Sequence, residues 1–195
     1  MRDRCREQLA RPAEQPPEDI TFRSAVEHYL TTDGRPELPP SWVTLELLTF
    51  GELIHLVRNL AEREDRNAIA QVLGVNEPLL ISWLRSYQRV RNICAHHGRL
   101  WNVGLGVYPA LPRSRRVAWL DRPEVLNRDQ RRAKRLYPVM VSIQSVLTTI
   151  SPRSTWASRL AALLDENPSV PLDGMGFPHD WSTDSFWSRH LADPQ

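Results

Sequence analysis

The stretch EPLLISWLRSYQRVRNICAHH, residues 77–97, has the clearest helical pattern in the chain. Pro78 suits the first turn of a helix, and Gly98 follows the stretch, where a left-handed residue is favoured. At about 100° per residue, the apolar side chains fall on one broad face. This face comprises Leu80, Trp83, Leu84, Tyr87, Val90 and Cys94. We therefore predict a long amphipathic helix over these residues.

Apolar residues recur at three- and four-residue spacing elsewhere, which predicts further helices. The expected ranges are 22–30, 41–73, 123–150 and 155–165. Gly51 marks a bend or a break in the second range, and Pro138 marks a bend in the third. Because no stretch has the alternating pattern of strands, the predicted fold is all-α.

The composition changes at both ends of the chain. Residues 1–20 are charged and interrupted by prolines, which is typical of a mobile lead-in, and residues 21–166 hold the predicted helical domain. The tail, residues 167–195, is rich in proline and glycine but contains Trp181, Phe186 and Trp187. These aromatic residues predict that the tail packs on the helical domain.

The overall composition is that of a soluble globular protein, with 195 residues, 41% hydrophobic and 25% charged. The net charge of +2 gives no general argument for a nucleic-acid partner. Cys5 and Cys94 are too few for a disulfide framework, and the N-terminus lacks the apolar core of a signal peptide. The longest apolar stretch, residues 136–150, is too short and too polar to cross a bilayer, so we expect a cytoplasmic protein without a membrane partner.

Arg91 lies close to the middle of the apolar face of the central helix, where a guanidinium needs a partner. It must extend to solvent, pair with a carboxylate in a structural salt bridge, or face a partner or a site. Asn92 and His96 share another side of the helix because they are four residues apart, and His97 follows in the last turn. Histidine exchanges protons near neutral pH, so either imidazole could act as a general base or acid, although such histidines are often only capping or core residues.

Metal and cysteine chemistry fit the spacing poorly. Adjacent histidines point in different directions on a helix, so His96 and His97 are poor joint metal ligands. The other histidines form no HExxH or Cys/His cluster; they are His28, His55, His179 and His190. Cys94 lies on the apolar face, which favours a packed thiol over a nucleophile. We therefore predict no metal site.

A basic segment follows the central helix. Residues 113–135 contain nine basic and three acidic residues, a net charge of +6, so the rest of the chain sums to −4. The basic residues are Arg113, Arg115, Arg116, Arg122, Arg128, Arg131, Arg132, Lys134 and Arg135. This segment could form a phosphate-binding surface or simply a solvated helix face.

The segment RNICAHHGRLWN, residues 91–102, closely resembles the signature of the Abi-like (abortive infection) family of bacterial phage-defence proteins. Other matching elements are PPSW at 39–42, LLTFGEL at 47–53, SWL at 82–84 and MGFPHDW at 175–181. The resemblance therefore covers about residues 20–190.

The Abi-like family is similar to a branch of the HEPN superfamily, helical domains that often carry an R-x(4–6)-H motif in metal-independent ribonucleases. Both His96 and His97 satisfy this spacing from Arg91, and Asn92 matches the polar residue that commonly follows the arginine. The resemblance implies a HEPN-like helical bundle with extra helices and a Pro/aromatic-rich C-terminal tail. It also implies a homodimer, since such sites are commonly assembled at a two-fold interface.

The implied function is a metal-independent endoribonuclease in phage defence or a toxin, with Arg91, Asn92, His96 and His97 as catalytic residues and no cofactor. A histidine would take a proton from a ribose 2′-hydroxyl, Arg91 would stabilise the charge on the phosphate, and a 2′,3′-cyclic phosphate would result. RNA is the expected partner, together with a protein or RNA antitoxin. The expected phosphate contacts are Arg99, Arg113, Arg115, Arg116, Arg131 and Arg132.

Two alternatives stand beside this hypothesis. The chain could be a non-catalytic RNA-binding or dimerisation module, or an inactive truncated member, because family members usually have a longer N-terminal portion. It could also be a structural protein in which the arginine and histidines of the central helix form only a core ion-pair network.

Overall fold

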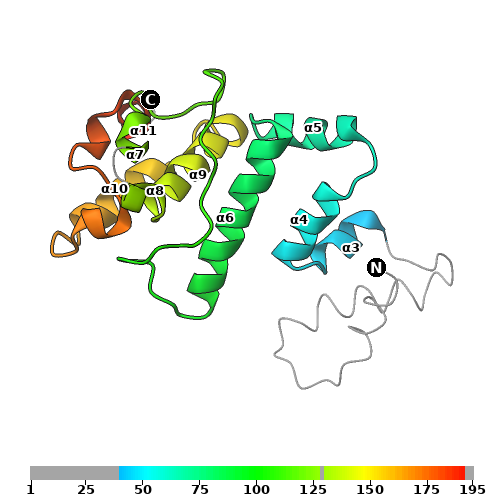
Figure 1. Ribbon diagram of the computed structural model, residues 1–195, viewed down its shortest axis with the longest axis horizontal. Coiled ribbons are helices and arrows are strands. Elements are labelled where there is room, and N and C mark those ends of the chain that lie inside the picture. Colours follow the sequence, from blue (N-terminus) through cyan, green and yellow to red (C-terminus); the bar gives the residue numbers. More distant parts are fainter. Residues whose placement is uncertain (1–39, 128–129, 192–195) are drawn as a thin grey trace. The chain divides into compact units, whose positions relative to one another are not determined.

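The computed structural model describes residues 40–127 and 130–191, and the side chains of residues 127, 130 and 131 are outside this description. The chain divides into two compact units, residues 1–53 and 54–195, with the division inside helix α4 (Phe50–Arg58). The helix expected over residues 22–30 lies outside the described residues. Figure 1 labels the elements that follow.

The described part of the first unit contains helix α3 (Ser41–Glu46) and the first turn of α4. Thr49 and Glu52 form a capping box: the Thr49 amide donates to Glu52 Oε2 at 2.8 Å, and the Glu52 amide donates to Thr49 Oγ1 at 3.3 Å. The chain therefore starts a new helix after Thr49. The helix expected over 41–73 is divided, but the division lies at residues 47–49 and not at Gly51, which is inside the first turn of α4.

The second unit is built from helices joined by connections of unequal length, and the longest connection, residues 96–123, lies between α6 and α7. They are α5 (Arg63–Val72), α6 (Glu77–Ala95), α7 (Glu124–Asn127), α8 (Gln130–Ala133), α9 (Tyr137–Ile150), α10 (Trp156–Asp165) and α11 (Ser185–Leu191), with short 3₁₀ helices at Leu172–Met175 and Trp181–Thr183. No strand occurs in the described ranges, which confirms the all-α prediction.

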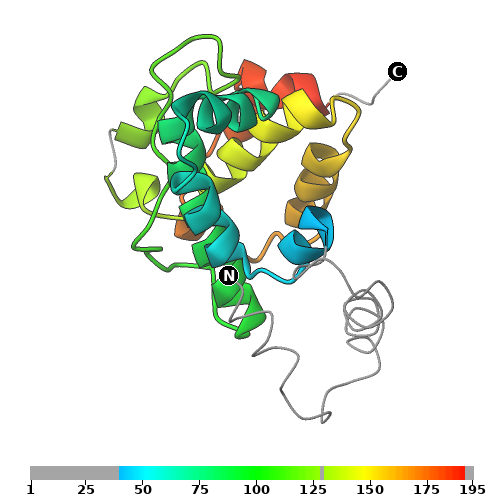
Figure 2. The same cartoon turned by 90° about the vertical axis from the view of Figure 1, so that its right-hand side faces the viewer.

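Helix α6 is the central element of this unit and packs against α5 and α9 (Figures 1 and 2). Asn76 caps its start, since its side-chain Oδ1 accepts the Leu79 amide at 3.0 Å, and Pro78 occupies the first turn as predicted. Leu80 and Trp83 are completely buried on the face toward the core. The helix therefore begins where the sequence predicts and ends at Ala95, two residues early.

Residues 98–120 return alongside α6 in the opposite direction. Near the end of the helix, Arg89 Nε donates to the Leu105 carbonyl at 3.0 Å. Near its start, Trp83 Nε1 donates to the Ala110 carbonyl and the Ala110 amide donates to Ser82 Oγ, both at 2.9 Å. These bonds fix the course of an irregular segment that has no helical hydrogen bonds of its own.

The helix expected over 123–150 is wrong as a continuous element. The chain forms α7, α8 and α9 instead, and Pro138 lies in the first turn of α9 rather than at a bend. Proline is tolerated in a first turn because its missing N–H would have no helical partner there. The expected helix over 155–165 is confirmed as α10 within one residue.

Aromatic residues of the C-terminal segment fill the core beside α9. Phe177, Trp181, Phe186 and Trp187 are all buried, and Trp187 Nε1 donates to the Tyr137 hydroxyl at 3.1 Å. Burial raises the pKa of Tyr137, so this phenol stays protonated. Residues 111–191 therefore contribute to one core, in which the C-terminal segment packs with α9 and α10.

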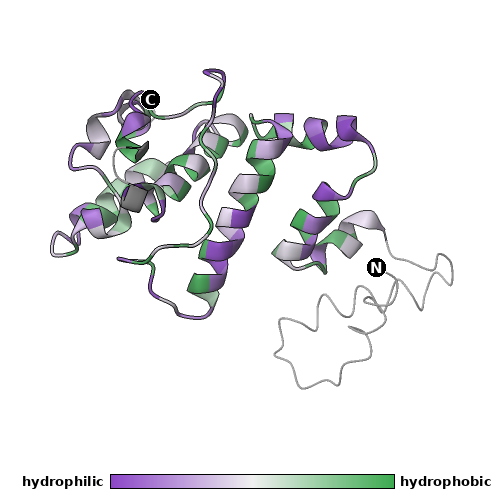
Figure 3. Ribbon diagram, viewed as in Figure 1, coloured by the Kyte–Doolittle hydropathy of each residue, from purple (hydrophilic) through white to green (hydrophobic). Residues whose placement is uncertain are grey.

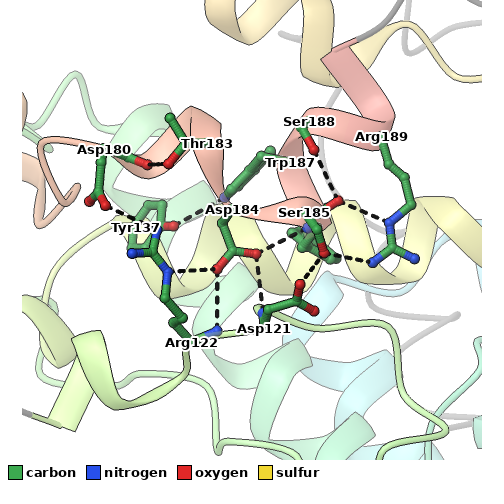
Figure 4. Close-up of polar contacts among 11 residues, drawn as sticks. Asp121, Arg122, Tyr137, Asp180, Thr183, Asp184, Ser185, Trp187, Ser188 and Arg189 are labelled. Atoms are coloured by element: carbon green, nitrogen blue, oxygen red, sulfur yellow. Dashed lines mark hydrogen bonds and ion pairs between the residues drawn. The ribbon is translucent and has the colours of Figure 1, made fainter.

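Asp184 fastens this segment to the turn before α7 (Figure 4). Its buried carboxylate accepts the backbone amides of Asp121 at 3.1 Å, Arg122 at 3.3 Å and Phe186 at 3.0 Å. The Arg122 side chain also pairs with Asp180 at 3.0 Å on the surface, which lowers the pKa of that carboxyl. A single buried carboxylate thus satisfies three backbone donors from two distant segments.

We predict that Asp184→Ala lowers the free energy of unfolding by about 2–4 kcal/mol, because it leaves three buried or half-buried amides without their acceptor. Asp180→Ala is the matched control and should cost less than about 1 kcal/mol, since its pair with Arg122 is exposed. Urea unfolding followed by circular dichroism measures both. Equal losses in the two variants would contradict the anchoring role of Asp184.

Candidate active site

The end of α6 has a complete set of C-terminal closing hydrogen bonds. The His96 amide donates to the Asn92 carbonyl at 3.1 Å, the His97 amide to Cys94 at 3.0 Å, and the Gly98 amide to Ile93 at 2.7 Å. The last two bonds are those of a Schellman motif, which satisfies carbonyls that the helix itself leaves open. The turn that holds both histidines is therefore well defined.

The left-handed residue of this motif is His97, with φ of 52°, and not Gly98. This corrects the expectation from the sequence, in which Gly98 was assigned that position. Gly98 is required for another reason: a Cβ there would lie 2.9 Å from Ile93 Cγ2 and 3.0 Å from the Ile93 carbonyl oxygen. The glycine allows close approach, and the histidine carries the backbone strain.

Left-handed backbone costs a residue with a Cβ about 1–2 kcal/mol relative to the right-handed form. His97 and Asn102 are the two non-glycine residues with positive φ in the described ranges, and both belong to the RNICAHHGRLWN segment. The side chains of His96 and His97 are exposed. An exposed histidine pair in which His97 has a strained backbone is a candidate for a functional role.

Arg91 is exposed, and its Nη1 donates to Asn92 Oδ1 at 3.3 Å. Among the residues that the structure describes, it forms no ion pair with a carboxylate. The described residues therefore give no support to the hypothesis that the arginine and histidines of this helix form a core ion-pair network. The guanidinium is available to an external anion or to another protein surface.

Arg91 borders an apolar groove of about 390 Å³ between α6 and α9. The groove is lined by Tyr87, Val90, Arg91, Val139, Ile143, Val146 and Leu147. Burial raises the pKa of Tyr87, so the phenol remains neutral here. The groove is open to solvent on the side where Arg91 lies, and its apolar lining gives it the character of a contact surface.

One copy of the chain does not place Arg91 and His96 on the same face of α6. Five residues correspond to a rotation of about 140° around a helix axis. Asn92 and His96 lie on the flank of α6 that faces away from the groove. The hydrogen bond from Arg91 to the Asn92 side chain connects the two sides of the helix. The four predicted catalytic residues therefore surround the end of α6 without converging in one pocket.

Cys94 is exposed, so the interpretation of a packed thiol is wrong. At this level of the helix Ile93, and not Cys94, packs on the cluster formed by Leu105, Leu136 and Val139. The packed stripe of the helix therefore continues from Tyr87 and Val90 to Ile93. Within the described ranges, no cluster of three or more His, Cys, Asp or Glu side chains could bind a metal ion. None of the described helices has both the length and the apolar character that a membrane span requires.

The RLWN part of the motif has a structural role. The Trp101 Nε1 donates to the Pro171 carbonyl at 2.9 Å, and the Asn102 amide donates to the Gly174 carbonyl at 2.8 Å. Gly174 is required because a Cβ would lie 2.4 Å from Trp101 Nε1. Arg135 donates to both Asn102 Oδ1 and the Gly174 carbonyl. These contacts, which sequence reasoning missed, hold the loop after the histidines against the C-terminal segment.

The expected phosphate-binding arginines are spread over the second unit. Arg99 is exposed two residues after His97, whereas Arg113, Arg115 and Arg116 are exposed in the turn before Val117, which packs with Leu79 at the start of α6. The helix length separates this turn from the histidines by roughly 25 Å. Arg132 is half-buried, and the Arg131 side chain lies outside the described residues. Among the expected phosphate contacts, Arg99 therefore follows the histidine turn directly, whereas Arg113, Arg115 and Arg116 are far from it.

Residues 2–102 match the family of Abi-like proteins. This is about half of the chain, and the match ends at Asn102, the last residue of the RNICAHHGRLWN segment. The chain belongs to the Abi-like family. No curated protein and no solved structure matches it. Membership suggests a role in abortive infection, and the family match covers α3 to α6 and the histidine turn, while MGFPHDW at 175–181 lies beyond it.

We predict that His97→Gly in this Abi-like protein raises the free energy of unfolding by about 0.5–1 kcal/mol, because glycine adopts the left-handed conformation without a Cβ penalty. His96→Gly is the control, since φ of −99° at this position gives glycine no such advantage. Urea unfolding compares the two variants. A loss of stability in His97→Gly as large as in His96→Gly would contradict the strained geometry.

Proposed function

We propose that this Abi-like protein is a metal-independent endoribonuclease whose site is the end of α6. The observation that carries the proposal is the strained turn that displays His96 and His97 to solvent, next to an arginine without a carboxylate partner in the described residues. Strain that is retained where a glycine would relieve it favours a role for the side chain itself.

In the proposed reaction, one histidine removes the proton from a ribose 2′-hydroxyl, and the resulting oxygen attacks the adjacent phosphorus. The bond from phosphorus to the 5′-oxygen breaks, and the second histidine protonates that oxygen. Arg91 stabilises the negative charge that develops on the phosphate, and Asn92 orients a histidine or a phosphate oxygen. The products are a 2′,3′-cyclic phosphate and a free 5′-hydroxyl, and the substrate is RNA because DNA lacks the 2′-hydroxyl.

We further propose that the working site is shared between two copies of the chain. Arg91 and His96 lie on different sides of α6, and Arg91 borders an open apolar groove. A second copy packed at this groove would bring its own histidines toward Arg91 and cover the apolar lining. In the cell, a protein or RNA antitoxin could restrain such an enzyme by covering the same turn.

We expect the purified protein to cleave a labelled mixed-sequence RNA in EDTA and the His96→Ala,His97→Ala variant to show at least a 100-fold lower rate. His55→Ala is the matched control, because His55 is an exposed histidine near the end of α4. Gel analysis of the products with an assay for cyclic phosphate ends gives both rate and chemistry. A folded protein that binds RNA without cleaving it would instead support a non-catalytic RNA-binding module.

A mixing experiment tests the shared site. Arg91→Ala and His96→Ala,His97→Ala should each be inactive alone, whereas their mixture should recover about one quarter of the parent activity, because half of the randomly paired dimers carry one intact site of two. Val90→Glu, which puts a charge into the groove, should give a monomer in sedimentation equilibrium and abolish the recovery. If the mixture shows no RNA cleavage while the parent protein is active, the whole site lies in one subunit.

A further inference from the structure

The longest segment without an acidic residue in the second unit is residues 78–120, which comprise α6 after Glu77 and the irregular segment that returns beside it. These 43 residues contain seven arginines and no aspartate or glutamate. The arginines are Arg85, Arg89, Arg91, Arg99, Arg113, Arg115 and Arg116. Because the whole chain has a net charge of +2, the remaining residues sum to −5. The positive charge is therefore concentrated in one folded-back segment.

One flank of α6 connects the histidine turn with two of these arginines. Arg85, Arg89, Asn92 and His96 are spaced by four, three and four residues, so they lie within about 60° of one another around the helix axis. Arg85 and His96 are about 16 Å apart along the axis. Figure 3 shows that hydrophilic residues gather on the C-terminal half of the helix. This flank is a basic stripe that leads to His96.

The stripe ends at a pocket of about 350 Å³ between the first half of α6 and the returning segment. Its lining includes Ile81 and Arg85 from the helix and Gly106, Val107 and Tyr108 from the segment. The Ala110 amide donates to Ser82 Oγ at 2.9 Å, and this bond holds the two walls together.

The lining residues of this pocket are open to a ligand. Tyr108 is 45% exposed and Val107 is 39% exposed, so both side chains are accessible to a ligand in the pocket. Arg85 is exposed and forms no ion pair or hydrogen bond with another described residue. A planar aromatic ring and an unpaired guanidinium therefore border the same pocket.

We propose that this pocket binds one nucleotide of a single-stranded RNA, whose chain then follows the basic stripe of α6 to His96. The base would stack on Tyr108, and the phosphate would bind the Arg85 guanidinium. A single strand is favoured over a duplex, because paired bases have no free face to stack on a side chain. At 3.4 Å per nucleotide in a stacked strand, the pocket lies about five nucleotides from the cleaved bond.

This inference rests on the proposed function for the identity of the ligand and adds the position of the substrate. It also accounts for three exposed arginines far from the histidines, Arg113, Arg115 and Arg116: they follow the pocket in sequence and would contact RNA beyond it. The bound strand would extend along one side of α6, whereas the groove on the other side stays available to a second copy.

The test measures binding of a fluorescein-labelled single-stranded RNA of about 12 nucleotides, long enough to reach from the pocket to the histidines. The parent for binding is the His96→Ala,His97→Ala chain, which cannot cleave the probe. Tyr108→Ala should weaken binding about 10-fold or more, and Tyr108→Phe should restore it, since stacking needs the ring and not the hydroxyl. Circular dichroism confirms that each variant is folded, which is expected because Tyr108 is outside the core.

The phosphate contact of Arg85 is tested by the salt dependence of RNA binding in the same assay. Arg85→Ala should reduce the slope of log K against log salt by about 0.7, the loss of one phosphate contact to a single strand, whereas Tyr108→Ala should leave the slope unchanged. Arg159→Ala is the matched control, an exposed arginine on α10, and should change neither affinity nor slope.

The outcomes separate this inference from the proposed enzyme activity. Unchanged RNA affinity in Tyr108→Ala, or an equal loss in Arg159→Ala, would overturn the nucleotide pocket even if the parent cleaves RNA. Loss of affinity in Tyr108→Ala with rescue by phenylalanine would support the pocket even if the wild-type chain cleaves nothing in EDTA. In that second case the proposed ribonuclease activity fails and the RNA-binding surface stands.

Discussion

The packing of the buried Trp83 indole against the returning segment is the interaction on which the rest of the second unit depends. The indole is completely inaccessible, its ring stacks on Trp119 with centroids 5.4 Å apart, and its Nε1 donates to the Ala110 carbonyl. The stacking and the hydrogen bond both tie the returning segment to α6. Without them the segment, which has no helical bonds of its own, would lose its fixed course. The histidine turn, the basic stripe and the Tyr108 pocket all require that course.

The strained His97 turn is held from both sides. Before it, the helix supplies the carbonyls that close the Schellman motif, and Gly98 allows the close contact with Ile93. After it, Trp101 and Asn102 bind the carbonyls of the 3₁₀ helix at Leu172–Met175 and its preceding residue. A cost of about 1–2 kcal/mol is significant beside a typical domain stability of about 5–15 kcal/mol. The C-terminal segment, anchored by Asp184, thus supports the site from a distance.

The two sides of α6 have separate properties. The side toward α9 combines Arg91 with an apolar groove, and the flank that carries Arg85, Asn92 and His96 is polar and basic. A helix presents residues five apart in different directions, so Arg91 and His96 on a single copy of α6 cannot bring their side chains to one point. This geometry supports a site completed by a second chain, with the substrate on the polar flank.

The sequence by itself determined α6, its start with Pro78 in the first turn, the histidines at its end, and the all-α class, because these follow from local periodicity and capping within a few residues. It could not determine which residue of the final turn takes the left-handed form, since that depends on the contact between Gly98 and Ile93. Only tertiary structure divided residues 123–150 into three helices and exposed Cys94. It also carried Arg113–Arg116 to the far end of α6, because long-range hydrogen bonds, not local propensity, set the direction of the returning segment.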